Sequence, residues 1–202
     1  MRYGMMIAGL IVGIFIFYPE KSVSYGPGPV APDWPIQTNI NPGEKFPFKE
    51  YELTKLASFN ITARILSTED YRYDRESDLA PIDLALGWRQ MSDESILDHI
   101  SISQGARWMN WKTDFLPITM RDVIRQSANM HIIPASDELE SILEDLYKGQ
   151  VVELNGYLVR VRASDGWTWT SSMSREDSGS HACEVFYVER ITIVADGRPE
   201  ND

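Results

Sequence analysis

A histidine and a cysteine are the residues of this sequence whose chemistry best suits catalysis. His131 lies in the segment Ser127–Ala135, and histidine is the natural acid–base group at neutral pH. Asn129 is placed to orient its ring, and Cys183 is a candidate nucleophile. The structural alternative is that His131 bonds a loop carbonyl and that Cys183 is a small buried side chain. No further catalytic motif accompanies the pair, so we favour a protein that is not an enzyme and keep His131 and Cys183 as the alternative.

A second set of residues suits ligand binding. Aromatic rings stack on sugars and peptides, while cations and amides beside them orient the ligand. Three distant segments supply the same chemistry, a ring beside a cation or an amide. The residues that we expect at a ligand site are Trp88, Arg107, Trp108, Trp167, Trp169 and Arg175. A tryptophan-rich core with arginines stacked on it is the alternative. Solvent exposure of the rings distinguishes the two interpretations.

The histidines predict no metal centre. His99, His131 and His181 lie on separate segments without the H-x-x-x-H or H-E-x-x-H spacing of metal sites. Cys183 is the only cysteine, so there is no C-x-x-C pair, and an internal disulfide is excluded. No motif indicates a cofactor, and we expect none.

The composition indicates a folded, acidic protein. The net charge is −11 over 202 residues, with 43% hydrophobic and 11% aromatic residues. A chain of this charge repels phosphate backbones, which disfavours general nucleic-acid binding. The apolar content argues against disorder.

The first residues predict a membrane segment. Gly4–Tyr18 carries no charge and follows Arg2. As a helix this stretch would be about 22 Å long, and residues 1–18 would reach about 27 Å, against a bilayer core of about 30 Å. It is expected to act as a signal anchor, or as a signal peptide cleaved near Ser22–Ser24. We therefore divide the chain into a membrane anchor or signal segment (1–19), a Pro/Gly-rich linker (20–50), one globular domain (51–195) and a disordered tail (196–202).

The domain is predicted to be α+β, with about four strands and about three helices. Alternating apolar residues predict strands over 51–66, 151–162, 167–172 and 184–194, the last three forming an antiparallel meander. Gly156 inside its strand suggests a bend, and a partly open, OB-like barrel is one form that such a meander takes. Helices are expected after Ser92, Thr119 and Ser136, which are suitable N-caps.

Several segments together resemble one family of uncharacterised bacterial proteins with an N-terminal membrane segment. They are Asp83–Trp88 with Met91–Asp93, Ser103–Gln104 with Arg107–Trp108, Ser127–Ala135, and Trp167–Ser172 continuing through Arg175, Asp177, Gly179 and Ala182–Glu184. The similarity covers roughly residues 57 to 190. It implies a coherent domain in a bacterial envelope, and because that family has no established activity, it implies no catalytic role.

The sequence thus predicts a membrane-anchored envelope protein that is a non-catalytic binding or assembly module. Its expected partners are the membrane, through residues 1–18, and an envelope protein or a glycan or peptide ligand, but no nucleic acid. Its expected location is the bacterial inner membrane, with a single N-terminal span and the domain in the periplasm or outside. Secretion after cleavage is the alternative.

The competing functional prediction is an envelope hydrolase or transferase acting on the cell wall through His131 and Cys183. The segment Ser180–Cys183 is similar to the S-H-G-C signature of L,D-transpeptidases, which use a cysteine nucleophile. In this sequence alanine replaces the glycine, and no arginine follows the cysteine.

Overall fold

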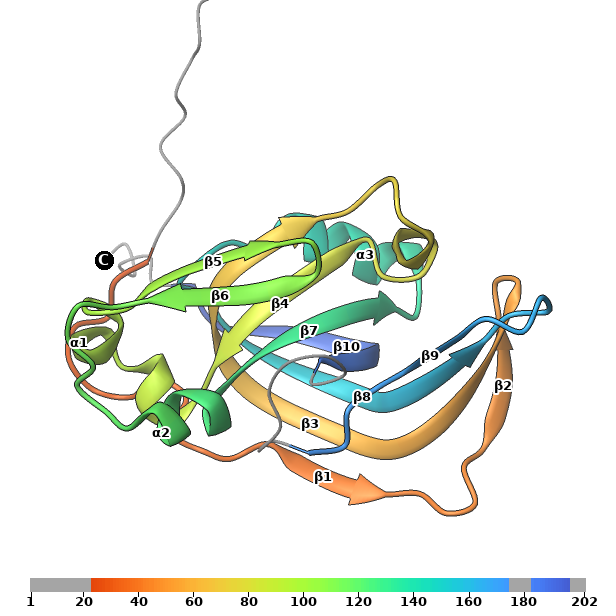
Figure 1. Ribbon diagram of the computed structural model, residues 1–202, viewed down its shortest axis with the longest axis horizontal. Coiled ribbons are helices and arrows are strands. Elements are labelled where there is room, and N and C mark those ends of the chain that lie inside the picture. The colour runs from red at the N-terminus through yellow and green to blue at the C-terminus, as the bar shows by residue number, and fades with distance from the viewer. Residues whose placement is uncertain (1–22, 175–182, 197–202) are drawn as a thin grey trace, which may run out of the picture.

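The structure is a computed structural model that describes residues 23–174 and 183–196 (Figure 1). Within these ranges the chain forms ten strands, three short α-helices and two 3-10 helices. The strands are β1 (Ile36–Asn39), β2 (Lys45–Phe48), β3 (Tyr51–Asp70), β4 (Ile82–Gly87), β5 (Ser101–Gly105), β6 (Trp108–Lys112), β7 (Ser127–Pro134), β8 (Val151–Arg162), β9 (Thr168–Thr170) and β10 (Glu184–Ala195). The helices are α1 (Glu94–Leu97), α2 (Met120–Arg125), α3 (Asp137–Glu144), η1 (Arg75–Asp78) and η2 (Arg89–Ser92).

Five of the strands close into a circuit. The pairings run β3–β4–β7–β10–β8, and β8 pairs back onto β3. All of these pairs are antiparallel except β7–β10, which is parallel. We number these strands 1 to 5 in chain order, as β3, β4, β7, β8 and β10. They then pair in the order 1-2-3-5-4 and back to 1, and α3 links strand 3 to strand 4. This is the connectivity of an OB-fold. Figure 1 shows how strongly β3 and β8 curve.

The enclosed face of this circuit holds the main core. On β3, Phe59, Ile61, Ala63 and Ile65 are buried while most of the residues between them are partly exposed, because successive side chains of a strand point to opposite faces. They join apolar residues of the other four strands and Leu143 and Leu146, which close one end from α3 and the turn after it. The sheet therefore covers its own apolar face.

The predicted fold class, α+β with about four strands and about three helices, is wrong. The three α-helices span only four, six and eight residues, which is too short to cover a sheet, and the chain is mostly β. The C-terminal strands also do not form a meander. β8 lies between β9 and β10, and both β8 and β10 belong to the larger eight-stranded mixed sheet.

The region predicted as a Pro/Gly-rich linker packs against the domain wherever the structure describes it. β1 and β2 lie within residues 20–50, and both pair with β3. The predicted membrane segment and all of the predicted tail except Asp196 lie outside the described residues. Among the residues that are described, no helix is long and apolar enough to cross a membrane.

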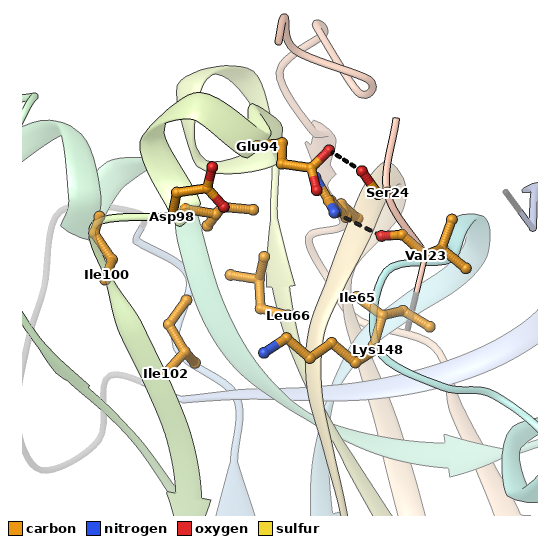
Figure 2. A pocket seen from close by; sticks show the side chains of 11 residues that line it. Val23, Ser24, Ile65, Leu66, Glu94, Asp98, Ile100, Ile102 and Lys148 are labelled. Carbon is orange, nitrogen blue, oxygen red and sulfur yellow. Dashed lines mark hydrogen bonds between the residues drawn. The ribbon is translucent and has the colours of Figure 1, made fainter. Parts of the chain in front are cut away.

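The first described residues are bonded tightly to the domain (Figure 2). The Glu94 carboxylate accepts hydrogen bonds from the Ser24 hydroxyl at 2.9 Å and from the next two backbone amides at 2.9 and 2.7 Å. The Ser24 hydrogen bond is the main reason that the pKa of Glu94 lies below its usual value. The guanidinium of the buried Arg64 donates to the carbonyl oxygen of Val23 at 2.9 Å. Residues 23–26 therefore form a strap, which we call the N-terminal strap.

Candidate functional site

A buried aspartate is the centre of the candidate site. Asp83 lies on β4 and is fully buried, which is costly for a carboxylate unless it is paired. Its Oδ1 accepts a hydrogen bond from Nη1 of Arg107 at 2.9 Å, and its Oδ2 accepts one from Nδ2 of Asn129 at 3.0 Å. His131 is its direct cross-strand partner on β7, and Nδ1 of that ring lies 2.9 Å from Oδ2. The His131 contact lacks hydrogen-bond geometry, so it is a close contact rather than a directed bond.

Arg107 joins this carboxylate to a second one. It lies in the turn between β5 and β6, and its Nε and Nη2 donate to the two oxygens of Asp74 at 2.8 and 2.7 Å. Burial lowers the pKa of Arg107, but hydrogen bonding to Asp74 and the charge of Asp83 raise it by more, so the guanidinium stays charged. The same hydrogen bond holds the pKa of Asp74 below its usual value. One guanidinium is thus clamped between two carboxylates, a short-range and geometrically specific arrangement.

The turn that carries Arg107 is strained. Ala106 and Arg107 have φ values of 49° and 63°, in the left-handed region that favours glycine. Placing two non-glycine residues there costs about 1–2 kcal/mol each. The contacts of Arg107 offset this cost, because its amide donates to the Tyr71 hydroxyl at 2.8 Å and its carbonyl oxygen accepts from Asn129 at 3.2 Å. The turn is held in place by side chains from other segments of the chain.

An open pocket of about 460 Å³ lies next to this network. It is lined by Glu76, Arg107, Trp108, His131, Thr168, Trp169, Thr170 and Cys183. Trp169 packs on His131, with ring centroids 4.9 Å apart, and the Arg107 guanidinium lies 5.8 Å from its ring. Trp108 is 41% exposed. Two rings and two threonines therefore surround a buried, charged floor.

The structure brings together three of the six predicted ligand-site residues. Arg107, Trp108 and Trp169 line the pocket. Trp167 is next to it, 6.2 Å from the Trp169 ring and stacked under Arg75. Trp88 is fully buried in the main core and does not line the pocket. Arg175 lies outside the described residues.

The two residues of the catalytic alternative also line this pocket. His131 is almost fully buried, and it forms part of the floor beside Trp169. The thiol of Cys183 lies 3.9 Å from the carbonyl oxygen of Arg107, in the turn between β5 and β6. Both residues are therefore within one site, as an acid–base and nucleophile pair would require.

Sequence reasoning missed Asp83 and Asp74, which hold the site together. One signal was present for Asp83: it is the only charged residue in the otherwise apolar strand Ile82–Gly87, and all six residues of that strand are buried. A charge in such a strand indicates a buried partner. Asp74 gave no such signal, because it lies in a polar turn and also caps η1.

A second cavity, of about 240 Å³, lies beside the N-terminal strap (Figure 2). Its apolar wall includes Leu66, Ile100 and Ile102, and Lys148 also lines it. The strap itself forms another wall and occupies the Glu94 carboxylate and the Arg64 guanidinium. We therefore assign this cavity to the packing of the strap.

Residues 23–174 and 183–196 contain no group of three His, Cys, Asp or Glu side chains that could hold a metal ion. Comparison with known proteins gives no match, since no family model, no curated protein and no solved structure is similar to this chain. The resemblance to uncharacterised bacterial envelope proteins stays a prediction. Any function must therefore be argued from the site.

Proposed function

We propose that this protein is a membrane-anchored, non-catalytic binding module of the bacterial envelope, and that its ligand occupies the pocket beside Trp169. The observation that carries this proposal is the composition of the pocket. The groups around its opening are the rings of Trp108 and Trp169 and the threonines of β9, which bind by stacking and hydrogen bonding.

The charged groups of the site support a binding role over a catalytic one. Nε, Nη1 and Nη2 of Arg107 all donate to Asp74, Asp83 or the carbonyl oxygen of Ala80. The carboxylate of Asp83 is likewise occupied by Arg107 and Asn129. These groups are committed to fixing the turn between β5 and β6, which is how a binding surface is preorganised at low entropic cost.

The position of the pocket in the fold gives weaker support. OB-folds use the face of their second and third strands and the adjoining loops to hold ligands. The corresponding strands in this protein are β4 and β7, which carry Asp83 and His131. This is an analogy of fold alone, which by itself does not define a function.

The envelope location in this proposal rests on the uncharged segment Gly4–Tyr18 after Arg2. A segment of that length and composition suits a single membrane span with its start in the cytoplasm. The acidic net charge of −11 argues against a nucleic-acid ligand.

A pair of tryptophan variants tests the proposal. Tryptophan fluorescence of the full chain in detergent micelles is followed while blocked peptides, neutral oligosaccharides or an envelope extract are added. We expect a saturable change with one of these probes and a loss of affinity of at least about tenfold in Trp108→Ala, because tryptophans at the centre of a site often dominate binding.

Trp34→Ala is the matched control, because Trp34 is 42% exposed against 41% for Trp108 and lies outside the pocket. Its affinity should equal that of the unmodified chain. The proposal is wrong if no probe changes the fluorescence, or if both variants lose affinity equally.

The second candidate function is a thiol hydrolase or transferase acting on the cell wall. One observation favours it: the buried Asp83 lies 2.9 Å from Nδ1 of His131, in a pocket that also contains Cys183. A carboxylate hydrogen-bonded to Nδ1 would orient an imidazole for proton transfer, and here the two atoms are close enough for such a bond although its geometry is not formed. Turnover of a cell-wall fragment that is lost in Cys183→Ala would show the second function, and no turnover by the unmodified chain would exclude it.

A further inference from the structure

The outer edge of β9 presents backbone groups that its sheet does not use. Among the described residues, β9 is the last strand in its sheet and pairs with β8 alone. In an antiparallel pair, hydrogen-bonded and non-bonded residue pairs alternate. The Ala163 amide donates to the Trp167 carbonyl oxygen at 2.9 Å and the Ser171 amide donates to the Val159 carbonyl oxygen at 3.0 Å, so residues 167, 169 and 171 face β8. The amides and carbonyls of Thr168 and Thr170 therefore point away from the sheet.

β9 is short, at three residues, but within the described residues it has none of the other features that usually protect an open strand. Native proteins place lysine, proline or a bulge on exposed edges to prevent strand addition. Thr168–Thr170 reads Thr-Trp-Thr, with both threonines exposed and pairing to β8 without a register shift. Threonine and tryptophan are also good strand residues. The edge is therefore competent to accept a further strand.

The pocket lies along the same edge. Thr168, Trp169 and Thr170 line it, together with Arg107 and Trp108 at the strained turn between β5 and β6. Because alternate side chains of an added strand point to opposite faces, every second residue would be directed at Trp169 and the His131 floor. The edge supplies backbone hydrogen bonds and the pocket supplies a place for side chains.

We infer that the ligand of this pocket is an extended peptide segment that adds to the edge of β9 as a further strand. The inference rests on the proposed binding function and specifies its ligand class. Backbone pairing supplies affinity that is independent of sequence, and the Trp169 pocket selects an apolar or aromatic side chain, which is the division of roles found in recognition by strand addition.

The decisive experiment uses peptides with blocked backbone groups. Blocked heptapeptides of randomised sequence are screened against the full chain in detergent micelles, and the tightest binder is remade with an N-methyl group at one residue at a time. We expect N-methylation at every second residue to weaken binding about five- to tenfold, the effect of losing one hydrogen bond. Methylation at the intervening residues should change affinity less than about twofold, because those amides point away from β9.

Two variants of the protein test the hydrogen bond that the outward amide of Thr170 would donate to the peptide. Thr170→Pro removes the outward amide while leaving the bonds to β8, since proline is tolerated where an edge amide faces solvent, and it should weaken the peptide about five- to tenfold. Thr170→Val keeps the amide and removes only the hydroxyl, so it should lose less affinity than Thr170→Pro. If Thr170→Pro does not fold, the N-methyl series alone decides.

The possible outcomes distinguish strand addition by a peptide from the binding function in general. Loss of affinity without a two-residue alternation would overturn strand addition. Binding of a neutral oligosaccharide that depends on Trp108, with no peptide bound, would also overturn it while leaving the binding function in place. If neither class of probe binds, both proposals fail.

Discussion

Arg107→Ala is expected to lower the free energy of unfolding by about 3–5 kcal/mol, the usual result of leaving a buried charge without its partner. The variant removes the cation that neutralises Asp83, whose side chain has no exposure to water. It also removes both hydrogen bonds to Asp74 and leaves the strained turn without its clamp. For a domain of this size the loss corresponds to a fall in Tm of roughly 2–4 °C per kcal/mol, measured by thermal unfolding followed by circular dichroism.

Arg75→Ala is the matched control. Arg75 also forms two hydrogen bonds to one aspartate, Asp165, at 2.8 and 3.0 Å, but both side chains are well exposed. Exposed pairs contribute little to stability because solvent screens them, so its Tm should change little. Adding Asp83→Asn to Arg107→Ala should restore part of the stability, because it removes the unpaired charge. Equal effects of the two arginine variants would show that Asp83 is not a buried charge neutralised by Arg107.

Gly156→Ala should destabilise the protein by at least about 3 kcal/mol, the upper end of the usual cost of overpacking. A Cβ at this position would lie 2.0 Å from the carbonyl oxygen of Tyr187 and 3.0 Å from the Cα of Val188. Both obstacles are backbone atoms of β10, which cannot move aside as a side chain can. Since β8 pairs with both β10 and β3, separating the strands would open the closed circuit itself.

Gly105→Ala provides the corresponding control within a strand. A Cβ at Gly105 would meet nothing within 4 Å, and its φ is not in the left-handed region. We expect a change within about 1 kcal/mol, with a small gain from reduced freedom of the unfolded chain. Thermal unfolding of both variants checks the prediction, and a similarly small effect of Gly156→Ala would mean that β8 and β10 lie farther apart than the structure places them.

Long strands and helix starts could be predicted from the sequence. The alternation over Phe59–Ile65 and the strand Val151–Arg162 correspond to β3 and β8. Thr119 and Ser136 are N-caps of α2 and α3, each accepting a hydrogen bond from the amide three residues on. These features depend on a local period or on a capping residue, and both are contained in a short window of sequence.

The fold class could not be predicted, because the missing strands are short. β1, β2, β5 and β6 have only four or five residues each, and such segments become strands through pairing with distant residues rather than through their own pattern. In β7 the buried polar residues Asn129 and His131 alternate with apolar ones, so the strand resembles one that is half exposed.

Part of the candidate site could be predicted from the sequence, and its partners could not, for a related reason. Tryptophans and arginines in adjacent positions are visible in the sequence, and three of those residues do line the pocket. The partners that fix them are set by register across β4 and β7, where Asp83 lies opposite His131. Register of this kind depends on the closed sheet as a whole and leaves no local signal.

With the membrane anchor that we propose, the N-terminal strap would limit how far the domain can search for a ligand. If residues 1–18 span the membrane, as we propose, only residues 19–22 separate that span from Val23, which is bonded to Arg64. Even fully extended, such a connection reaches less than about 20 Å. The domain would then stay within a thin layer over the bilayer surface. Its encounters with partners held in the same membrane would be nearly two-dimensional. A ligand carried on another membrane component would be present at a high effective concentration, while the same ligand free in solution would depend on its intrinsic affinity alone.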